Sequence, residues 1–189
     1  MTRFTGVHHV ALATKDMDAT IRFWRDVLGM RLVATLGRPG YRLYFFEVSQ
    51  SDLISFFEWP QVEPAIEKDP GVPVKGPAAF DHLAFGVASQ EELWELKKVI
   101  AAAGFWVSEV VDHGFIHSFY SFDPNNIALE FSWNVSGRDI RKFPLFKDKA
   151  PGPAARQGSE KQPLHLGNLS DHDDEDERIV YPGDGSEYY

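Results

Sequence analysis

The sequence contains no cysteine among its 189 residues. This absence excludes disulfides, thiolate nucleophiles and cysteine-type zinc sites, so any bound metal must be held by histidine and carboxylate side chains. The chain also has no run approaching the roughly 20 apolar residues that span a bilayer. Residues 1–6 run directly into an apolar, alternating segment without the apolar core of a signal peptide. We therefore expect no membrane partner and a cytoplasmic location.

Basic side chains are in deficit, with 19 Lys and Arg against 28 Asp and Glu and a formal net charge of -9. Because nucleic-acid binding depends on contacts from basic side chains to phosphates, this balance predicts no nucleic-acid partner. Much of the acidic excess lies in residues 171–177. That run contains His172 and could be taken as a cation site, but its composition favours a solvated stretch.

The composition changes near residue 135. Up to Trp133 the chain is dense in Val, Ile, Leu, Phe and Trp, whereas Pro, Gly, Ser, Lys and Asp prevail after it. The second part buries too little apolar surface to offset its ordering entropy. We expect a compact domain over residues 1–134 and an extended tail over 135–189, with apolar pieces at 143–146 and 179–182 that could dock.

An internal repeat organises the compact part. Residues 7–12 can be laid on residues 80–85 with an offset of 73, and residues 56–59 on residues 128–131 with an offset of 72. Between these anchors both halves show the same order of patterns, a helix followed by three strands. The repeat therefore indicates two copies of one βαβββ module.

The expected elements follow from apolar spacing and from glycine positions. Helical spacing predicts helices over residues 16–28 and 89–103, each ending near a glycine, Gly29 or Gly104. Strands are expected over residues 31–34, 41–48, 53–59, 106–110, 115–122 and 127–133.

These elements predict an α+β fold class. The modules cover residues 5–60 and 78–134, and a proline-containing linker joins them over residues 61–77. We expect the sheets of the two modules to close around a shared cleft.

Four polar side chains repeat as His…Glu, His…Glu at His9, Glu58, His82 and Glu130. Each histidine has an alanine two residues on, and Glu130 has small neighbours on its face, whereas bulky residues share the face of Glu58. A carboxylate on an apolar strand is costly to bury unless it is paired or binds a metal. Each residue alone is more often structural, but the repetition predicts one divalent ion: Fe(II), Mn(II), Ni(II) or Zn(II). His8 faces away from His9.

Four segments carry a family resemblance: HHVAL (8–12), FWRDVLGM (23–30), FDHLAF (80–85) and FDPNNIALE (122–130). Through them, residues 6–133 resemble the vicinal oxygen chelate superfamily, which includes glyoxalase I, fosfomycin- and bleomycin-resistance proteins and type I extradiol dioxygenases. The resemblance implies that His9, His82 and Glu130 are metal ligands with an open face for a bidentate oxygen ligand. It also implies a small-molecule substrate and a homodimer.

The resemblance leaves the reaction open. With Glu58 as fourth ligand, the set is similar to that of glyoxalase I-like isomerases, lyases and epimerases, in which a carboxylate moves a proton. The second pattern, His113, Tyr120, an Asp-Pro pair and Glu130, resembles extradiol dioxygenases, although Asn126 stands where that pattern has Gly or Pro. There Tyr120 would hydrogen-bond a phenolate, His113 would guide the substrate, and Glu58 would be a nearby base.

We narrowly prefer ring cleavage of a catecholic substrate with Fe(II) and O₂, because aromatic residues near the cleft favour a flat or apolar ligand. The chain has only two modules, whereas the extradiol enzymes usually carry an additional pair, and this counts against the dioxygenase. The glyoxalase is disfavoured because the sequence has no clear basic cluster that could bind the carboxylates of glutathione. A non-catalytic binding or resistance protein is a third alternative, against which the intact His and Glu set counts. His117 lies three residues from Tyr120 and therefore on the opposite face of a regular strand.

Overall fold

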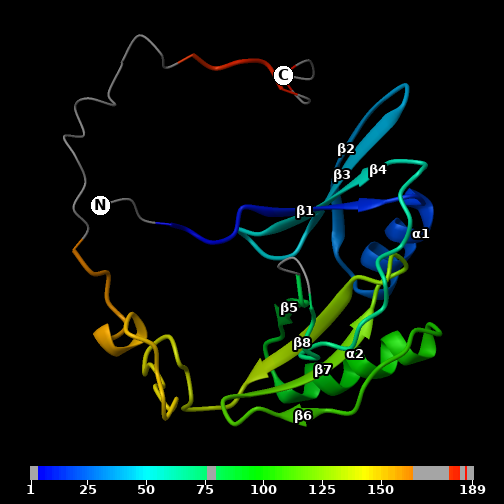
Figure 1. Cartoon of the computed structure of the whole chain (residues 1–189). Coiled ribbons are helices and arrows are strands. Elements are labelled where there is room, and N and C mark those ends of the chain that lie inside the picture. Colours follow the sequence, from blue (N-terminus) through cyan, green and yellow to red (C-terminus); the bar gives the residue numbers. More distant parts are fainter. Residues whose placement is uncertain (1–3, 76–79, 164–178, 184–185, 187–189) are drawn as a thin grey trace. The chain divides into compact units, whose positions relative to one another are not determined.

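The computed structural model describes residues 4–75, 80–163, 179–183 and 186. By its internal contacts the chain divides into two units, Met1–Arg138 and Asp139–Tyr189. All strands of the described residues lie in the first unit, which Figure 1 colours from blue to yellow-green.

The second unit contains one short 3-10 turn in its described part, η2 (Ala155–Gln157). The side chains of Phe143, Leu145 and Phe146 are exposed there. The acidic run 171–177 with His172 lies outside the described residues.

The first module consists of two helical segments and four strands that form one sheet. Its strand order is β1-β4-β3-β2, with β1 parallel to β4 and the other pairs antiparallel. The elements are β1 (His9–Thr14), α1 (Met17–Ile21), η1 (Arg22–Val27), β2 (Arg31–Arg38), β3 (Tyr41–Glu47) and β4 (Leu53–Glu58).

The second module repeats this plan. Its strand order is β5-β8-β7-β6, and again the first strand is parallel to the last while the other pairs are antiparallel. The two βαβββ modules predicted from the repeat are therefore confirmed. The elements are β5 (Leu83–Gly86), α2 (Gln90–Ala102), β6 (Val111–Asp112), β7 (Ile116–Phe122) and β8 (Ala128–Asn134).

The helices begin and end where the sequence places their caps. Asp16 and Ser89 each accept a hydrogen bond from the backbone amide three residues on, which satisfies a donor that the first turn leaves free. Gly29 and Gly104 follow the helical segments with φ of 74° and 88°, a left-handed conformation that glycine adopts without steric cost.

The first helix is not regular along its predicted length. After Ile21 the chain widens into the π-type turn η1, in which the amide of Leu28 donates to the carbonyl of Phe23, five residues back, at 3.0 Å.

The strand predicted over residues 106–110 is wrong, because this segment makes only one isolated bridge, from Val107 to Ser121. The hydroxyl of Ser108 accepts the amide proton of Tyr120 at 2.8 Å, in place of a backbone carbonyl. The outer strand of the second sheet is instead the short β6, which follows this segment directly.

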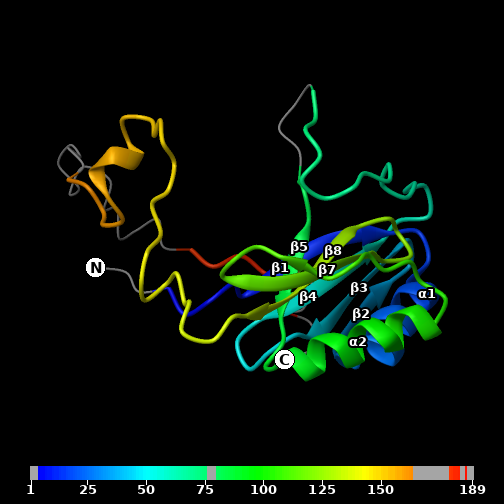
Figure 2. The same cartoon turned by 90° about the horizontal axis from the view of Figure 1, so that it is seen from below.

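The core lies between the sheets and the helices. Figure 2 shows α1 and α2 along one side of the strands. Hydrogen bonds link the two modules within this core. The indole of Trp24 donates to the carboxylate of Asp123 at 3.2 Å, and the hydroxyl of Thr14 donates to the side-chain oxygen of Asn125 at 2.7 Å. The fully buried apolar side chains form one cluster: Met17, Phe23, Trp24, Phe46, Ile54, Phe56, Leu93, Ile100, Phe119, Leu129 and Phe131.

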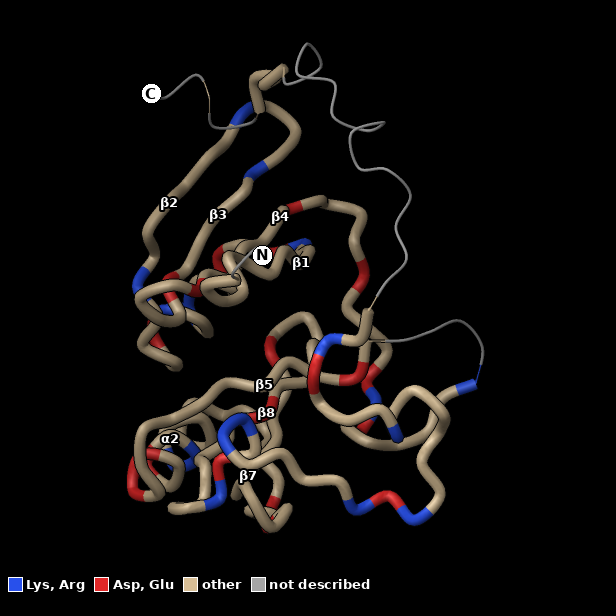
Figure 3. Tube along the Cα trace, turned by 90° about the vertical axis from the view of Figure 1, so that its left-hand side faces the viewer, with Lys and Arg blue, Asp and Glu red and all other residues tan. Residues whose placement is uncertain are grey.

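Two further features concern helix length and the placement of charge. No helix in the described part of the chain is long and apolar enough to cross a bilayer. In Figure 3, Lys and Arg are scattered among Asp and Glu along the trace.

Candidate metal centre

The middle of the second sheet carries a buried carboxylate paired with a histidine. Pairing of β5 with β8 sets Ala84 beside Glu130, and His82 lies two residues before Ala84, on the same face. Nε2 of His82 is 2.9 Å from Oε2 of Glu130, and the side chain of Glu130 is only 7% exposed. Because the neighbouring Leu129 and Phe131 belong to the core cluster, Glu130 faces away from the helices.

A tyrosine and a second histidine complete this group. Tyr120 is the cross-strand partner of Glu130, and its ring centroid lies 5.8 Å from that of His82. Its hydroxyl is 3.2 Å from Nε2 of His113. Burial first, and then the negative charge of Glu130, raise the pKa of Tyr120, so its phenol keeps its proton near neutrality and can donate it in a hydrogen bond. The structure thus brings together His82, Glu130, Tyr120 and His113.

Two further residues of this group are absent from the sequence prediction. Asp81 directly precedes His82, and its Oδ1 lies 2.6 Å from Nδ1 of that ring. Lys68, from the linker between the modules, donates to Oδ2 of Asp81 at 2.7 Å. These bonds, that of Lys68 above all, hold the pKa of Asp81 well below its usual range. An acidic residue next to a candidate ligand histidine was the available signal for Asp81, whereas Lys68 lies in a segment without periodic pattern.

His9 lies on the first sheet and is exposed. Its Nδ1 is 2.9 Å from Nδ1 of His8, and its ring contacts the ring of Phe45 at a centroid distance of 5.9 Å. The close contact of the two histidine rings differs from the expectation that His8 faces away. Over the described residues, no three His, Asp or Glu side chains already form a metal-binding group.

Glu58 does not occupy the place of Glu130 in the first sheet. Its carboxylate accepts the backbone amide of Met17 at the start of α1 at 2.9 Å, and its other oxygen is 2.9 Å from Nη1 of Arg42. Because Glu58 lies three residues from Ser55 on β4, the two side chains point to opposite faces of the sheet.

The strand registers identify the true counterpart of Glu130. In the second sheet Ala84 on β5 and Tyr120 on β7 flank Glu130; in the first, the matching positions on β1 and β3 flank Ser55. Ser55 is thus equivalent to Glu130, and the alignment of Glu58 with Glu130 by an offset of 72 is wrong. Ser55 is 0% exposed, and its Oγ is a buried side-chain polar atom without a hydrogen-bond partner among the described residues.

The contacts of Glu58 with Met17 and Arg42 give it a structural role with a measurable consequence. Glu58→Gln removes a carboxylate from a helix N-terminus and from Arg42, so we expect a loss of about 0.5–2 kcal/mol in the free energy of unfolding. Divalent-metal affinity should not change. Denaturant unfolding and metal titration measure the two quantities. The matched control is Glu47→Gln, which breaks an exposed pair with Arg31 and should cost less than about 1 kcal/mol. A large loss of metal affinity in Glu58→Gln would contradict this assignment.

His117 is separate from this group. Its ring lies against Trp133 at a centroid distance of 5.5 Å, and its Nε2 is 3.5 Å from Asp112. It therefore lies on the face opposite to Tyr120, as strand alternation predicts.

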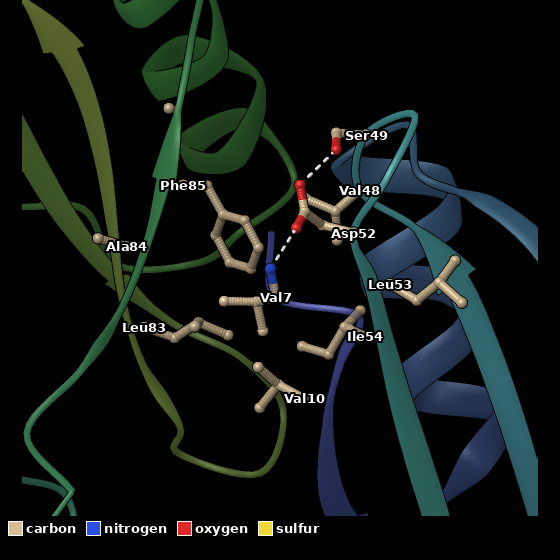
Figure 4. A pocket seen from close by; sticks show the side chains of 11 residues that line it. Val7, Val10, Val48, Ser49, Asp52, Leu53, Ile54, Leu83, Ala84 and Phe85 are labelled. Carbon is tan, nitrogen blue, oxygen red and sulfur yellow. Dashed lines mark hydrogen bonds between the residues drawn. The ribbon is translucent and has the colours of Figure 1, made fainter. Parts of the chain in front are cut away.

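An apolar cavity of about 300 Å³ lies where β5 meets β1 and β4. Figure 4 shows side chains from these strands converging on it, including Val10, Ile54 and Leu83. Its carboxylate, Asp52, accepts the amide of Val7 and the hydroxyl of Ser49. The lining of this cavity therefore offers apolar contact rather than acid–base chemistry.

Comparisons with known proteins cover the residues that build both modules. A family model of the Glyoxalase/Bleomycin resistance protein/Dioxygenase superfamily matches residues 6–131. Lactoylglutathione lyase of Haemophilus influenzae is 26% identical over 137 residues, which is 68% of this chain and 92% of the lyase.

Solved structures with the same architecture include two from other bacteria. A glyoxylase/bleomycin resistance protein/dioxygenase domain from Frankia sp. EAN1pec has a TM-score of 0.59 and 24% identity, covering 70% of this chain and 100% of that one. The fosfomycin resistance protein FosX from Listeria monocytogenes, in complex with Mn(II) and sulfate, has a TM-score of 0.55 and 20% identity, covering 73% and 99%. At these identities the likeness bears on the fold alone.

Proposed function

Because the chain belongs to the glyoxalase/bleomycin resistance protein/dioxygenase superfamily, we propose that it is a divalent-metal-dependent enzyme that cleaves the ring of a catecholic substrate with Fe(II) and O₂. The observation that carries this proposal is the serine at position 55. In the lyase alternative the first module supplies a fourth, carboxylate ligand, whereas here the position equivalent to Glu130 holds Ser55.

The residues present fit a divalent cation. A buried carboxylate and an imidazole nitrogen converge at Glu130 and His82, and this donor chemistry suits Fe(II), Mn(II), Ni(II) and Zn(II). We propose that His9, His82 and Glu130 hold the ion. When bound, Fe(II) would supply the redox chemistry that lets O₂ react with a catecholate. Both oxygen atoms enter the ring-opened product, so the reaction balances without a further reductant.

The remaining polar residues would bind and orient the substrate. The Tyr120 phenol can donate to an anionic substrate oxygen, and burial and the charge of Glu130, which raise its pKa, further favour the protonated form. His113 contacts the Tyr120 hydroxyl and stands at the edge of the same group. Phe45, the first-sheet counterpart of Tyr120, supplies apolar surface against which an aromatic ring can pack.

A glyoxalase-like lyase is the second candidate, because the Haemophilus influenzae relative carries that name and its likeness covers 68% of this chain and 92% of the lyase. In this reading Ni(II) or Zn(II) would replace Fe(II). A carboxylate other than one at position 55 would have to move the proton, and Glu58 is engaged by Arg42 and Met17. A non-catalytic binding protein is the third candidate.

The experiment that separates the candidates supplies each chemistry with its own metal. The chain is loaded anaerobically with Fe(II) and mixed with oxygenated buffer and a panel of catechols, while oxygen uptake and ring-opened product are recorded. Separately, the Ni(II)-loaded chain is given the hemithioacetal of methylglyoxal and glutathione. We expect oxygen uptake matched by product in the first assay and no turnover in the second. Turnover in the second assay alone would favour the lyase, and metal binding without turnover the binding protein.

We further propose that the protein is a homodimer whose sites combine His9 of one chain with His82 and Glu130 of the other. The basis is that His9 makes its own ring contacts on the first sheet, whereas His82 and Glu130 contact each other on the second. His9→Ala and Glu130→Gln chains, co-expressed with different affinity tags, then give a heterodimer with one intact site. We expect this heterodimer to bind one Co(II) while each mutant homodimer binds none. A heterodimer without Co(II) would mean that each chain builds its own site, and a monomeric protein would exclude the arrangement.

A further inference from the structure

A continuous chain of hydrogen bonds runs from the linker between the modules to the candidate ligand His82. His82 faces Glu130 through Nε2, at 2.9 Å, and Asp81 through Nδ1, at 2.6 Å. The ring is therefore held at both nitrogens, and its orientation depends on both carboxylates. Asp81 acts on the nitrogen that faces away from the proposed ion.

Asp81 is itself held by the linker. Lys68 donates to its Oδ2 at 2.7 Å, and the backbone amide of Gly71 donates to its Oδ1 at 2.9 Å. The Lys68 ammonium also donates to the carbonyl of Asp69 at 3.0 Å, which fixes the lysine within its own loop. The carboxylate of Asp81 thus accepts from three donors, two of them supplied by the linker.

The linker is in turn anchored to the second sheet. The amide of Ala65 donates to the carbonyl of Asn125 at 2.8 Å, and the side chain of Asn126 donates to the carbonyl of Ala65 at 3.1 Å. Asn125 and Asn126 belong to the turn that leads into β8, the strand of Glu130. The linker is therefore anchored, three residues before Lys68, to the turn that precedes the strand whose carboxylate faces His82.

We propose that Lys68 is a positioning residue of the metal centre: it fixes Asp81, and Asp81 orients the His82 ring so that Nε2 faces the ion. The proposal rests on the proposed function in taking His82 as a ligand. A carboxylate that accepts the Nδ1 proton selects the tautomer in which Nε2 carries the free lone pair. Lys68 keeps that carboxylate at the ring, because its ammonium holds the second oxygen of Asp81.

The role of Lys68 is tested by a double-mutant cycle on Co(II) affinity, measured by competition with a chelator. Asp81→Ala should weaken binding about 10–100-fold, the usual loss when the hydrogen-bond partner of a ligating histidine is removed. Lys68→Met should weaken it less, by about 3–10-fold, and Lys68→Arg should restore much of the loss. In the Asp81→Ala background, Lys68→Met should change the affinity by no more than about twofold, because its effect passes through Asp81.

The matched control is Lys98→Met, which breaks an exposed pair with Glu95 on α2 and should leave the Co(II) affinity unchanged. A Lys68→Met effect of the same size in both backgrounds, or an unchanged affinity in Asp81→Ala, would overturn the proposal.

A second measurement needs no metal, and its outcome does not depend on the proposed function. In metal-free protein with ¹⁵N-labelled histidine, the ring shifts of His82 should report a proton on Nδ1, because the carboxylate of Asp81 accepts a hydrogen bond at that nitrogen. Asp81→Ala should shift the ring towards Nε2–H, and Lys68→Met should shift it part of the way. A ring without a proton on Nδ1 in the unaltered chain would refute the positioning role. If Co(II) fails to bind the unaltered chain but these shifts appear, the proposed metal centre is wrong and the Lys68–Asp81–His82 chain stands.

Discussion

Glu130→Gln should lower Co(II) affinity by more than about 100-fold, beyond the loss expected when only the partner of a ligand is removed. Glutamine preserves the size of the side chain but not the negative charge that the ion needs at this buried place. The metal-free variant should be at least as stable as the unaltered chain, because burying a carboxylate is more costly than burying an amide. Isothermal titration and thermal unfolding with and without Co(II) measure the two effects.

The control for this prediction is Glu58→Gln, a chemically identical change on the equivalent strand of the other module. It should preserve the stabilisation by Co(II) and lower only the stability of the metal-free chain. Persistence of that stabilisation in Glu130→Gln would remove Glu130 from the metal centre. Reversed outcomes for the two variants would restore the four-ligand interpretation with Glu58.

Ser55→Glu should strengthen Co(II) binding by about tenfold or more, a gain of about 1.4 kcal/mol, and should suppress oxygen uptake on catechols. The added carboxylate lies at the position that mirrors Glu130, so it can supply a fourth protein ligand and occupy a position needed by the substrate or O₂. Because Ser55 is fully buried, the smaller Ser55→Asp is made in parallel, and circular dichroism verifies that both variants fold.

Ser55→Ala is the matched control for the added carboxylate. It removes only a hydroxyl that has no hydrogen-bond partner among the described residues, so affinity and oxygen uptake should not change and stability should not fall. If Ser55→Ala weakened Co(II) binding as strongly as Glu130→Gln, the hydroxyl would be a ligand. Undiminished oxygen uptake in a folded, metal-loaded Ser55→Glu would contradict the three-ligand site.

Sequence patterns predicted the modules because their signals are local. The helical patterns that begin at Asp16 and Ser89 and the glycines that follow each helix depend only on neighbouring residues, and the structure confirms them. The strand prediction for residues 106–110 failed because the apolar residues of this segment resemble a strand, whereas the hydroxyl of Ser108 accepts the backbone amide proton of Tyr120. Such a competition between side chain and ladder is not visible in hydrophobic periodicity.

The sequence-based choice of candidate ligands depended on how well strand register could be inferred. Matching glutamates to each other set Glu58 against Glu130, a slip of three residues that moves a side chain to the other face. Matching the buried neighbours would have avoided the slip, because Ile54 and Phe56 flank Ser55 as Leu129 and Phe131 flank Glu130. The role of Lys68 required the path of the linker, which no periodic pattern reveals.

The most direct test of the three-ligand metal centre is the anomalous diffraction of Co(II)-loaded crystals at the cobalt edge. The proposed site predicts one cobalt peak for each chain, bonded by His9, His82 and Glu130, with both Ser55 and Glu58 outside bonding distance. The same map shows whether His9 comes from the chain that supplies Glu130 or from its partner. A cobalt ion bonded by Glu58, or one that lies away from Glu130, would contradict the account.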